Sequence, residues 1–203
     1  GGCGTSTSSS SRRATDLVES STARAGHAGA TGVGRGGRLR CSLVQGGSIV
    51  GGRYELVRKL AEGGMGAVWE ARHTLSKKTV ALKILGAETI RDETSRTRFL
   101  REVAAPAAIG HDGIVEVYDA GFDAAVGALF VAMEMLHGET LRALLVRGGV
   151  TPARIVQIVL ELLPALAAAH AAGFIHRDLK PENVFLHRRR DGTERVRILD
   201  FGI

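Results

Sequence analysis

The chain has 203 residues, of which 44% are apolar, and a formal net charge of +6. This length suits one domain with a tail, or two small domains, and the apolar fraction allows a sizeable core. Cys3 and Cys41 both precede the segments that we expect to fold, which excludes a disulfide framework and favours a reducing, cytoplasmic setting. Because the chain starts with Gly1 rather than Met, we expect a fragment or a processed product.

Residues 1–48 are rich in Gly and Ser, and six arginines against Asp16 and Glu19 give this segment +4 of the net +6. So few apolar residues cannot offset the entropy of ordering, which predicts a disordered tail. Its glycine–arginine stretch at 34–38 resembles nucleic-acid-binding tails, a role that would require salt-sensitive binding. A solvated linker is favoured instead, and no specific nucleic-acid partner is predicted.

Residues 49–136 show strand-like apolar runs around a Gly-rich turn, which predicts five strands and one helix. We expect the strands near Tyr54–Leu60, Ala67–Ala71, Thr79–Leu85, Ile114–Tyr118 and Leu129–Met135, and the helix over Arg91–Ile109. Pro106 should end or kink this helix.

Residues 137–203 have a different character. Helices are predicted over Leu141–Val146 and Pro152–Ala172, the second capped by Thr151, and Val184–Leu186 with Val196–Leu199 should form a hairpin. A mainly β lobe is thus followed by a mainly helical lobe.

The longest apolar stretch is Ile155–Ile175, and it contains Gln157, Glu161, Pro164 and His170. Such residues are costly in a bilayer, so we expect a buried soluble helix and no membrane span in these residues. A membrane anchor beyond residue 203 is left open.

Two motifs fall in the first lobe. The segment Ala61–Val68 is a Gly-rich hairpin of the kind that lets backbone N–H groups approach phosphates, although a plain tight turn would also explain it. It lacks the Gly-Lys-Ser/Thr of a Walker loop and the following helix of a dinucleotide site. Lys83 lies in an apolar strand and needs an anionic partner such as phosphate or Glu102, unless it points into water from a sheet edge.

Two further motifs fall in the second lobe. His176–Asn183 places an acid, two bases and an amide directly after a helix, a polar density that structure alone explains poorly. Asp200, at the end of a strand and followed by Phe201 and Gly202, could bind a hard cation such as Mg²⁺ through oxygen.

The order and spacing of these motifs resemble the protein-kinase signature from about Tyr54 to Ile203. The residues of the Gly-rich loop and of Ala168–Gly173 are similar to those of the bacterial branch of serine/threonine kinases. The segment Lys180–Glu182 resembles that of the Ser/Thr class. The resemblance implies an α+β bilobal kinase fold over 49–203. Its five-stranded antiparallel N-lobe with one helix would cover about 49–136, and an incomplete, mainly helical C-lobe would follow.

The resemblance also implies roles for single residues. Asp178 would accept the proton of a substrate hydroxyl, Lys180 would steady the γ-phosphate, Asn183 and Asp200 would hold Mg²⁺, and Lys83 would bind ATP phosphates and pair with Glu102. Met133 would be the gatekeeper. The residues expected around ATP are Ala61, Glu62, Gly63, Gly64, Met65, Gly66, Val68, Ala81, Lys83, Met133, Glu134, Leu136 and Phe185.

Departures from the family pattern are Ala61 in place of the first loop glycine, Pro106 four residues after Glu102, and a longer turn at 187–194. An activation loop and a peptide-binding region do not occur within the 203 residues. We therefore expect these residues alone to be inactive, and a longer parent protein to phosphorylate Ser/Thr hydroxyls of proteins. The alternatives are a non-catalytic ATP-binding pseudokinase or scaffold, and a small-molecule phosphotransferase of kinase-like fold.

Overall fold

The computed structural model describes residues 44–63, 66–86, 97, 99–100, 103 and 105–201. Most of the predicted tail lies outside these ranges, as do Gly64, Met65 and Glu102. Val44 is already buried against the core of the first lobe, five residues before the expected start at Ile49. The predicted domain limits stay predictions.

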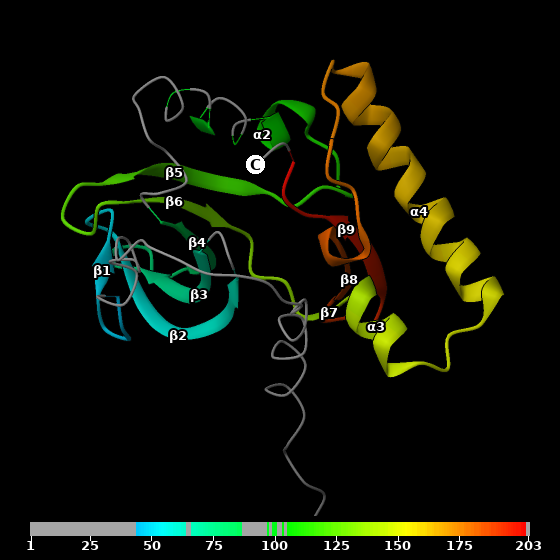
Figure 1. Cartoon of the computed structure of the whole chain (residues 1–203), viewed down its shortest axis with the longest axis horizontal. Coiled ribbons are helices and arrows are strands. Elements are labelled where there is room, and N and C mark those ends of the chain that lie inside the picture. The colour runs from blue at the N-terminus through cyan, green and yellow to red at the C-terminus, as the bar shows by residue number, and fades with distance from the viewer. Residues whose placement is uncertain are drawn as a thin grey trace, which may run out of the picture.

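The first lobe is a six-stranded antiparallel sheet in the order β1-β2-β3-β4-β6-β5 (Figure 1). The strands are β1 (Ile49–Val50), β2 (Tyr54–Gly63), β3 (Gly66–His73), β4 (Thr79–Leu85), β5 (Val117–Asp123) and β6 (Ala128–Met133). Five strands were predicted, and the short β1 is additional. The fourth predicted strand was placed too early, because Ile114 instead forms a parallel bridge with Ile198 of the second lobe.

The two faces of this sheet bury different side chains, as the period of two requires. On β4, the residues Val80, Leu82 and Ile84 belong to one hydrophobic cluster, whereas Ala81 and Leu85 belong to the other. Phe99 and Val103, both helical, pack into this second cluster. α2 (Ala105–Ile109) contains Pro106 and stops at the predicted Ile109, so Pro106 does not end it. The predicted start of the helix lies outside the described residues.

A partly exposed polar contact joins β5 to the start of β2 and to the residue before it. Asp119 Oδ2 accepts hydrogen bonds from Arg53 Nε at 2.7 Å and from Tyr54 Oη at 2.9 Å. Burial and the bond to Asp119 raise the pKa of Tyr54 to about 12. Burial alone would raise the pKa of Asp119, but the bonds from Arg53 and Tyr54 outweigh it and hold the pKa below its ordinary value.

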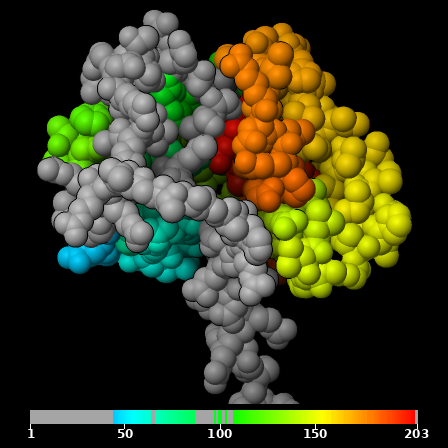
Figure 2. Space-filling view, in the orientation of Figure 1, coloured from blue at the N-terminus to red at the C-terminus, as the bar shows by residue number. Residues whose placement is uncertain are grey.

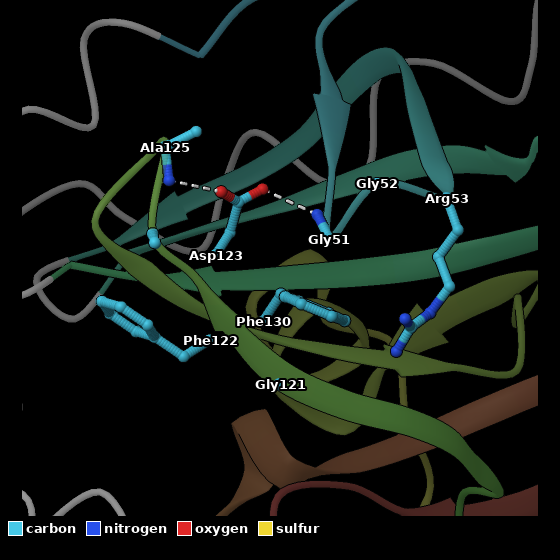
Figure 3. A pocket seen from close by; sticks show the side chains of 9 residues that line it. Gly51, Gly52, Arg53, Gly121, Phe122, Asp123, Ala125 and Phe130 are labelled. Carbon is cyan, nitrogen blue, oxygen red and sulfur yellow. Dashed lines mark hydrogen bonds between the residues drawn. The ribbon is translucent and has the colours of Figure 1, made fainter.

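A hollow of about 330 Å³ lies at the edge of the sheet, between the turn that follows β1 and the end of β5 (Figure 3). Asp123 closes it: its carboxylate accepts the backbone N–H groups of Gly51 at 2.7 Å and Ala125 at 2.8 Å. Both oxygens of this carboxylate thus have backbone donors, so Asp123 serves to hold the two turns together and does not indicate a ligand site. None of the predicted site residues lines it.

The second lobe packs one long helix beside a three-stranded sheet of order β7-β8-β9 (Figure 1). Thr140 and Thr151 cap the N-termini of α3 and α4 through their hydroxyl oxygens. The elements are β7 (Gly138–Thr140), α3 (Leu141–Arg147), α4 (Pro152–Ala171), the 3₁₀ helix η4 (Pro181–Asn183), β8 (Val184–Arg188) and β9 (Glu194–Ile198). The two predicted helices and the hairpin are thus present.

Helix α4 is buried on one face only. Ile158, Leu162, Ala165 and Ala169 join the core of the second lobe, while the outer face carries exposed apolar side chains at 156, 159, 160 and 163. By length and composition, α4 is the one helix in the described part of the chain that could cross a membrane. The predicted burial therefore holds for its inner face, and Pro164 lies inside the helix without ending it.

Candidate functional site

Four of the residues predicted around ATP lie on the second face of the first-lobe sheet. Ala81 and Met133 are buried in the cluster on that face, and Val68 and Leu136 pack against it from β3 and from the connection between the lobes. Ala81 pairs with Met133 across β4 and β6. Four of the residues expected around the adenine thus share one apolar surface.

The two glycines that flank the loop tip differ in their surroundings. Gly63 and Gly66 pair with each other at the ends of β2 and β3. A Cβ at Gly66 would lie 2.0 Å from the Ile84 carbonyl oxygen, so Gly66 lets β3 approach β4. A Cβ at Gly63 would meet nothing within 4 Å, so the packing of the described residues does not require a glycine there.

Lys83 and Asp200 form an ion pair across the two lobes. Lys83 Nζ lies 2.8 Å from Asp200 Oδ1, and the side chains are 15% and 30% exposed. Lys83 follows Ala81 at the spacing of two residues that keeps both on one face of β4. The predicted partner Glu102 lies outside the described residues, so that pairing stays a prediction. Asp200 was predicted as a metal ligand, and its contact with Lys83 was not anticipated.

The Asp178 carboxylate binds the side chains of Lys180 and Asn183. Asp178 Oδ2 accepts hydrogen bonds from Lys180 Nζ at 2.7 Å and from Asn183 Nδ2 at 3.3 Å. The bond from Lys180 lowers the pKa of the exposed Asp178 carboxyl, and the same bond raises the pKa of Lys180. Both groups therefore stay charged at neutral pH. Among the described residues, Asp178 Oδ1 has no hydrogen-bond partner and can face a substrate.

The backbone is strained at both motifs. Among described non-glycine residues, positive φ occurs at Lys77, at Arg177 (63°) and at Asp200 (53°). The Asp178 N–H donates to the His176 carbonyl at 2.8 Å, so Arg177 is the centre of an i to i+2 turn of the rare γ type. Strain of this kind persists only where the surroundings hold it, and it concentrates at functional sites.

His176 links the two strained segments. Its Nε2 lies 2.8 Å from the Leu199 carbonyl oxygen, and its ring packs 4.7 Å from that of Phe201. The Leu199 N–H donates in turn to the Asn183 carbonyl at 2.8 Å. Asp200 is therefore held beside the loop 176–183, and Figure 2 shows the orange segment around residue 180 at the surface beside the red C-terminal residues.

Asn183 and Asp200 fit the requirements of a magnesium site. Asn183 is buried, and its Nδ2 donates to the Asp178 carbonyl at 2.8 Å, which leaves the amide oxygen free as a ligand among the described residues. Asp200 uses Oδ1 for Lys83 and offers Oδ2. Mg²⁺ commonly takes one or two protein oxygens and completes its shell with phosphates and water. Among the described residues, no group of three or more His, Cys, Asp or Glu gathers.

Glu134 lies in the connection between the lobes, and one of its two backbone polar groups is already paired. The Glu134 N–H donates to the Glu116 carbonyl at 2.9 Å, so only the Glu134 carbonyl remains to face an adenine edge. Phe185 is half-buried on β8, and the pocket cluster does not include it. Its predicted place around ATP stays a prediction.

Sequence reasoning missed Arg197, whose guanidinium reaches the Glu134 side chain at 3.2 Å. The available signal was a charged residue between the apolar Val196 and Ile198 of a strand. Burial of a cation requires a partner, but nothing in the sequence names a partner 63 positions away.

Comparison with known proteins agrees with this geometry. A model of the protein kinase domain matches residues 54–203. The chain belongs to the protein kinase family. This kinase chain is 42% identical over 158 residues to the serine/threonine-protein kinase pkn3 of Myxococcus xanthus, covering 77% of this chain and 29% of that protein. It is also 42% identical over 158 residues to PknJ of Mycobacterium tuberculosis, covering 77% and 26%.

The fold is shared with solved kinase structures. The Mycobacterium tuberculosis PknI kinase domain superimposes with a TM-score of 0.67 at 33% identity, over 79% of this chain and 63% of that one. The bilobal kinase fold predicted from the motifs is therefore confirmed. The chain spans only about a quarter of the length of the curated kinases it matches.

Proposed function

We propose that this chain is the nucleotide-binding part of an ATP- and magnesium-dependent protein serine/threonine kinase. One observation carries the proposal: the Lys83–Asp200 ion pair and the Asp178–Lys180–Asn183 cluster lie side by side, joined by the bond between Leu199 and Asn183. Two cations, two carboxylates and an amide thus surround the place where phosphoryl transfer would occur. Phosphoryl transfer needs such positioned charge rather than covalent help from the protein.

The residues divide the work by their charge. Lys83 is only 15% exposed, so its ammonium group would bind phosphate oxygens once Asp200 leaves it to coordinate a metal cation. The bond from Lys180 lowers the pKa of Asp178 further below neutrality, and its free Oδ1 would accept the proton of a Ser or Thr hydroxyl. Lys180, 48% exposed beside it, would stabilise negative charge on the transferred group.

The adenine would lie against the apolar surface that Val68, Ala81, Met133 and Leu136 form. The Glu134 carbonyl, which has no partner among the described residues, would accept a hydrogen bond from the amino group of the adenine. Asn183 and Asp200 would hold magnesium through oxygen, and magnesium when bound would neutralise charge on the phosphates.

The test is transfer of labelled γ-phosphate from ATP to a generic Ser/Thr protein. It should be measured for the 203-residue chain and for the longest reading frame that contains it. We expect phosphoserine or phosphothreonine from the longer protein, loss of at least a hundredfold in the isosteric variant Asp178→Asn, and no transfer by residues 1–203 alone. Absence of transfer by the longer protein, or equal transfer by its Asp178→Asn variant, would contradict the proposal.

A further inference from the structure

Arg197 lies at a junction of three segments of the chain. Its Nη2 donates to Glu134 Oε2 at 3.2 Å, in the connection between the lobes. Its Nη1 donates to the carbonyl oxygen of Asp112 and, at 3.3 Å, to that of Ile114. The residue itself belongs to β9, which ends two residues before Asp200. One guanidinium thus joins the interlobe connection, the segment before β5 and the strand that leads to the predicted metal ligand.

This ion pair differs from the others in the described part of the chain. Arg197 and Glu134 are 13% and 15% exposed, and it is the one described pair in which both side chains are less than one-fifth exposed. Surface pairs are weak because water competes for both charges. A largely desolvated pair with additional hydrogen bonds holds its partners in place, since breaking it leaves a poorly compensated charge.

The Glu134 side chain has a second anchor. Its Oε1 accepts the Glu116 N–H at 3.1 Å, and its own N–H donates to the Glu116 carbonyl at 2.9 Å. Both carboxylate oxygens and the backbone N–H of Glu134 are therefore engaged. The orientation of this peptide, and with it the direction of the remaining carbonyl group, depends on the contacts with Glu116 and Arg197.

We propose that Arg197 is a positioning residue for the adenine of the nucleotide, acting through Glu134. The inference rests on the proposed function, because it requires that the Glu134 carbonyl faces an adenine. Arg197 would not touch the nucleotide. Its removal would leave Glu134 Oε2 without this donor and Oε1 held only by the Glu116 N–H, and would loosen the peptide that presents the carbonyl group.

The test compares nucleotide affinity in Arg197→Met, which keeps the length of the side chain and removes its charge, with that in Arg195→Met. Arg195 lies two residues earlier on β9 and forms a half-exposed pair with Glu161 at 3.5 Å, so its variant is the matched control. We expect the Kd for ATP to rise about tenfold in Arg197→Met, the equivalent of one hydrogen bond, and to stay within twofold in Arg195→Met.

A second probe separates positioning from a general loss of structure. Affinity for magnesium tripolyphosphate, which lacks the adenine, should be unchanged in Arg197→Met. The variant Glu134→Gln, which keeps the backbone, should reproduce the loss for ATP, and the double variant should lose no more than either single one. If Arg197→Met does not fold, Glu134→Gln and Arg197→Lys provide the same comparison.

Equal ATP affinity in the unmodified chain and in these variants would overturn this inference and leave the proposed function standing. An equal loss of ATP and tripolyphosphate affinity would also overturn it, because the defect would then be general. If the unmodified chain binds no ATP, the proposed function fails and this inference fails with it.

Discussion

The two glycines at the tip of the β2–β3 hairpin give the sharpest prediction, because they should fail in opposite ways. At Gly66 a methyl group would stand 2.0 Å from the Ile84 carbonyl oxygen and 3.1 Å from Leu85 Cα. The φ angle of Gly66 is 149°, a backbone conformation that residues with a side chain rarely adopt, so alanine would also be strained there. Gly63 has open space around it and no such φ.

The expected loss of stability follows from these distances. Backbone strain costs about 1–3 kcal/mol, and forcing β3 away from β4 adds about 1–3 kcal/mol of overpacking. Gly66→Ala should therefore lower the free energy of unfolding by roughly 2–6 kcal/mol, a large share of the 5–15 kcal/mol typical of a domain. Gly63→Ala should stay within about 0.5–1 kcal/mol of the unmodified chain, and the reduced freedom of its unfolded state favours a small gain.

For ATP affinity, Gly63→Ala should matter even though it hardly changes stability. Gly63→Ala is expected to fold normally and to bind ATP about tenfold more weakly, because its methyl group occupies space left for phosphates. Urea denaturation followed by circular dichroism gives the stabilities, and calorimetry gives the affinities. Equal denaturation midpoints for Gly66→Ala and the unmodified chain would refute the packing argument, and unchanged ATP affinity in Gly63→Ala would refute the assignment of the loop.

Three further changes test other parts of the structure. The lowered pKa of Asp119 means that its contacts with Arg53 and Tyr54 stabilise the fold fully above the unfolded pKa of 3.8 and less as the pH falls through the lower folded pKa. The unfolding free energies of Asp119→Asn and the unmodified chain should therefore differ at pH 6 and converge towards pH 3, and a difference independent of pH would contradict this. Thr151→Ala removes the cap of α4 and should cost about 1 kcal/mol in urea denaturation, so an unchanged midpoint would count against the cap. Asn183→Ala should cost about 1–3 kcal/mol, since a carbonyl loses its donor, and its ATP affinity should no longer rise with Mg²⁺.

Most of the fold could be predicted because apolar periods mark its elements. β4 keeps the same limits, Thr79–Leu85, in prediction and structure, since it is apolar on both faces. The prediction of β5 was displaced because this strand contains Asp119, Gly121 and Asp123, which weaken a strand pattern. Those carboxylates are paired with β2 and with the turn after β1, contacts that only the folded sheet creates.

Site residues that belong to one sequence motif could be predicted, whereas contacts between distant segments of the chain could not. Asp178, Lys180 and Asn183 are near neighbours in the sequence, so the loop between α4 and β8 brings them together locally. For Lys83 the predicted protein partner was Glu102, and its contact with Asp200 could not be foreseen because it depends on how the two lobes meet. Arg197 gave only a weak signal, since a single arginine in a hairpin strand is usually solvated.

The central claim is that residues 1–203 hold a magnesium-dependent ATP site centred on Asp200. Calorimetric titration with ATP, in excess Mg²⁺ and in EDTA, tests it most directly. The control is Asp200→Asn, because asparagine tolerates the positive φ of this position and removes only the charge. We expect the unmodified chain to bind ATP at least tenfold more tightly with Mg²⁺, and the variant to lose this difference while it stays folded. Equal affinity with and without Mg²⁺ in the unmodified chain, or an undiminished Mg²⁺ effect in Asp200→Asn, would contradict the account.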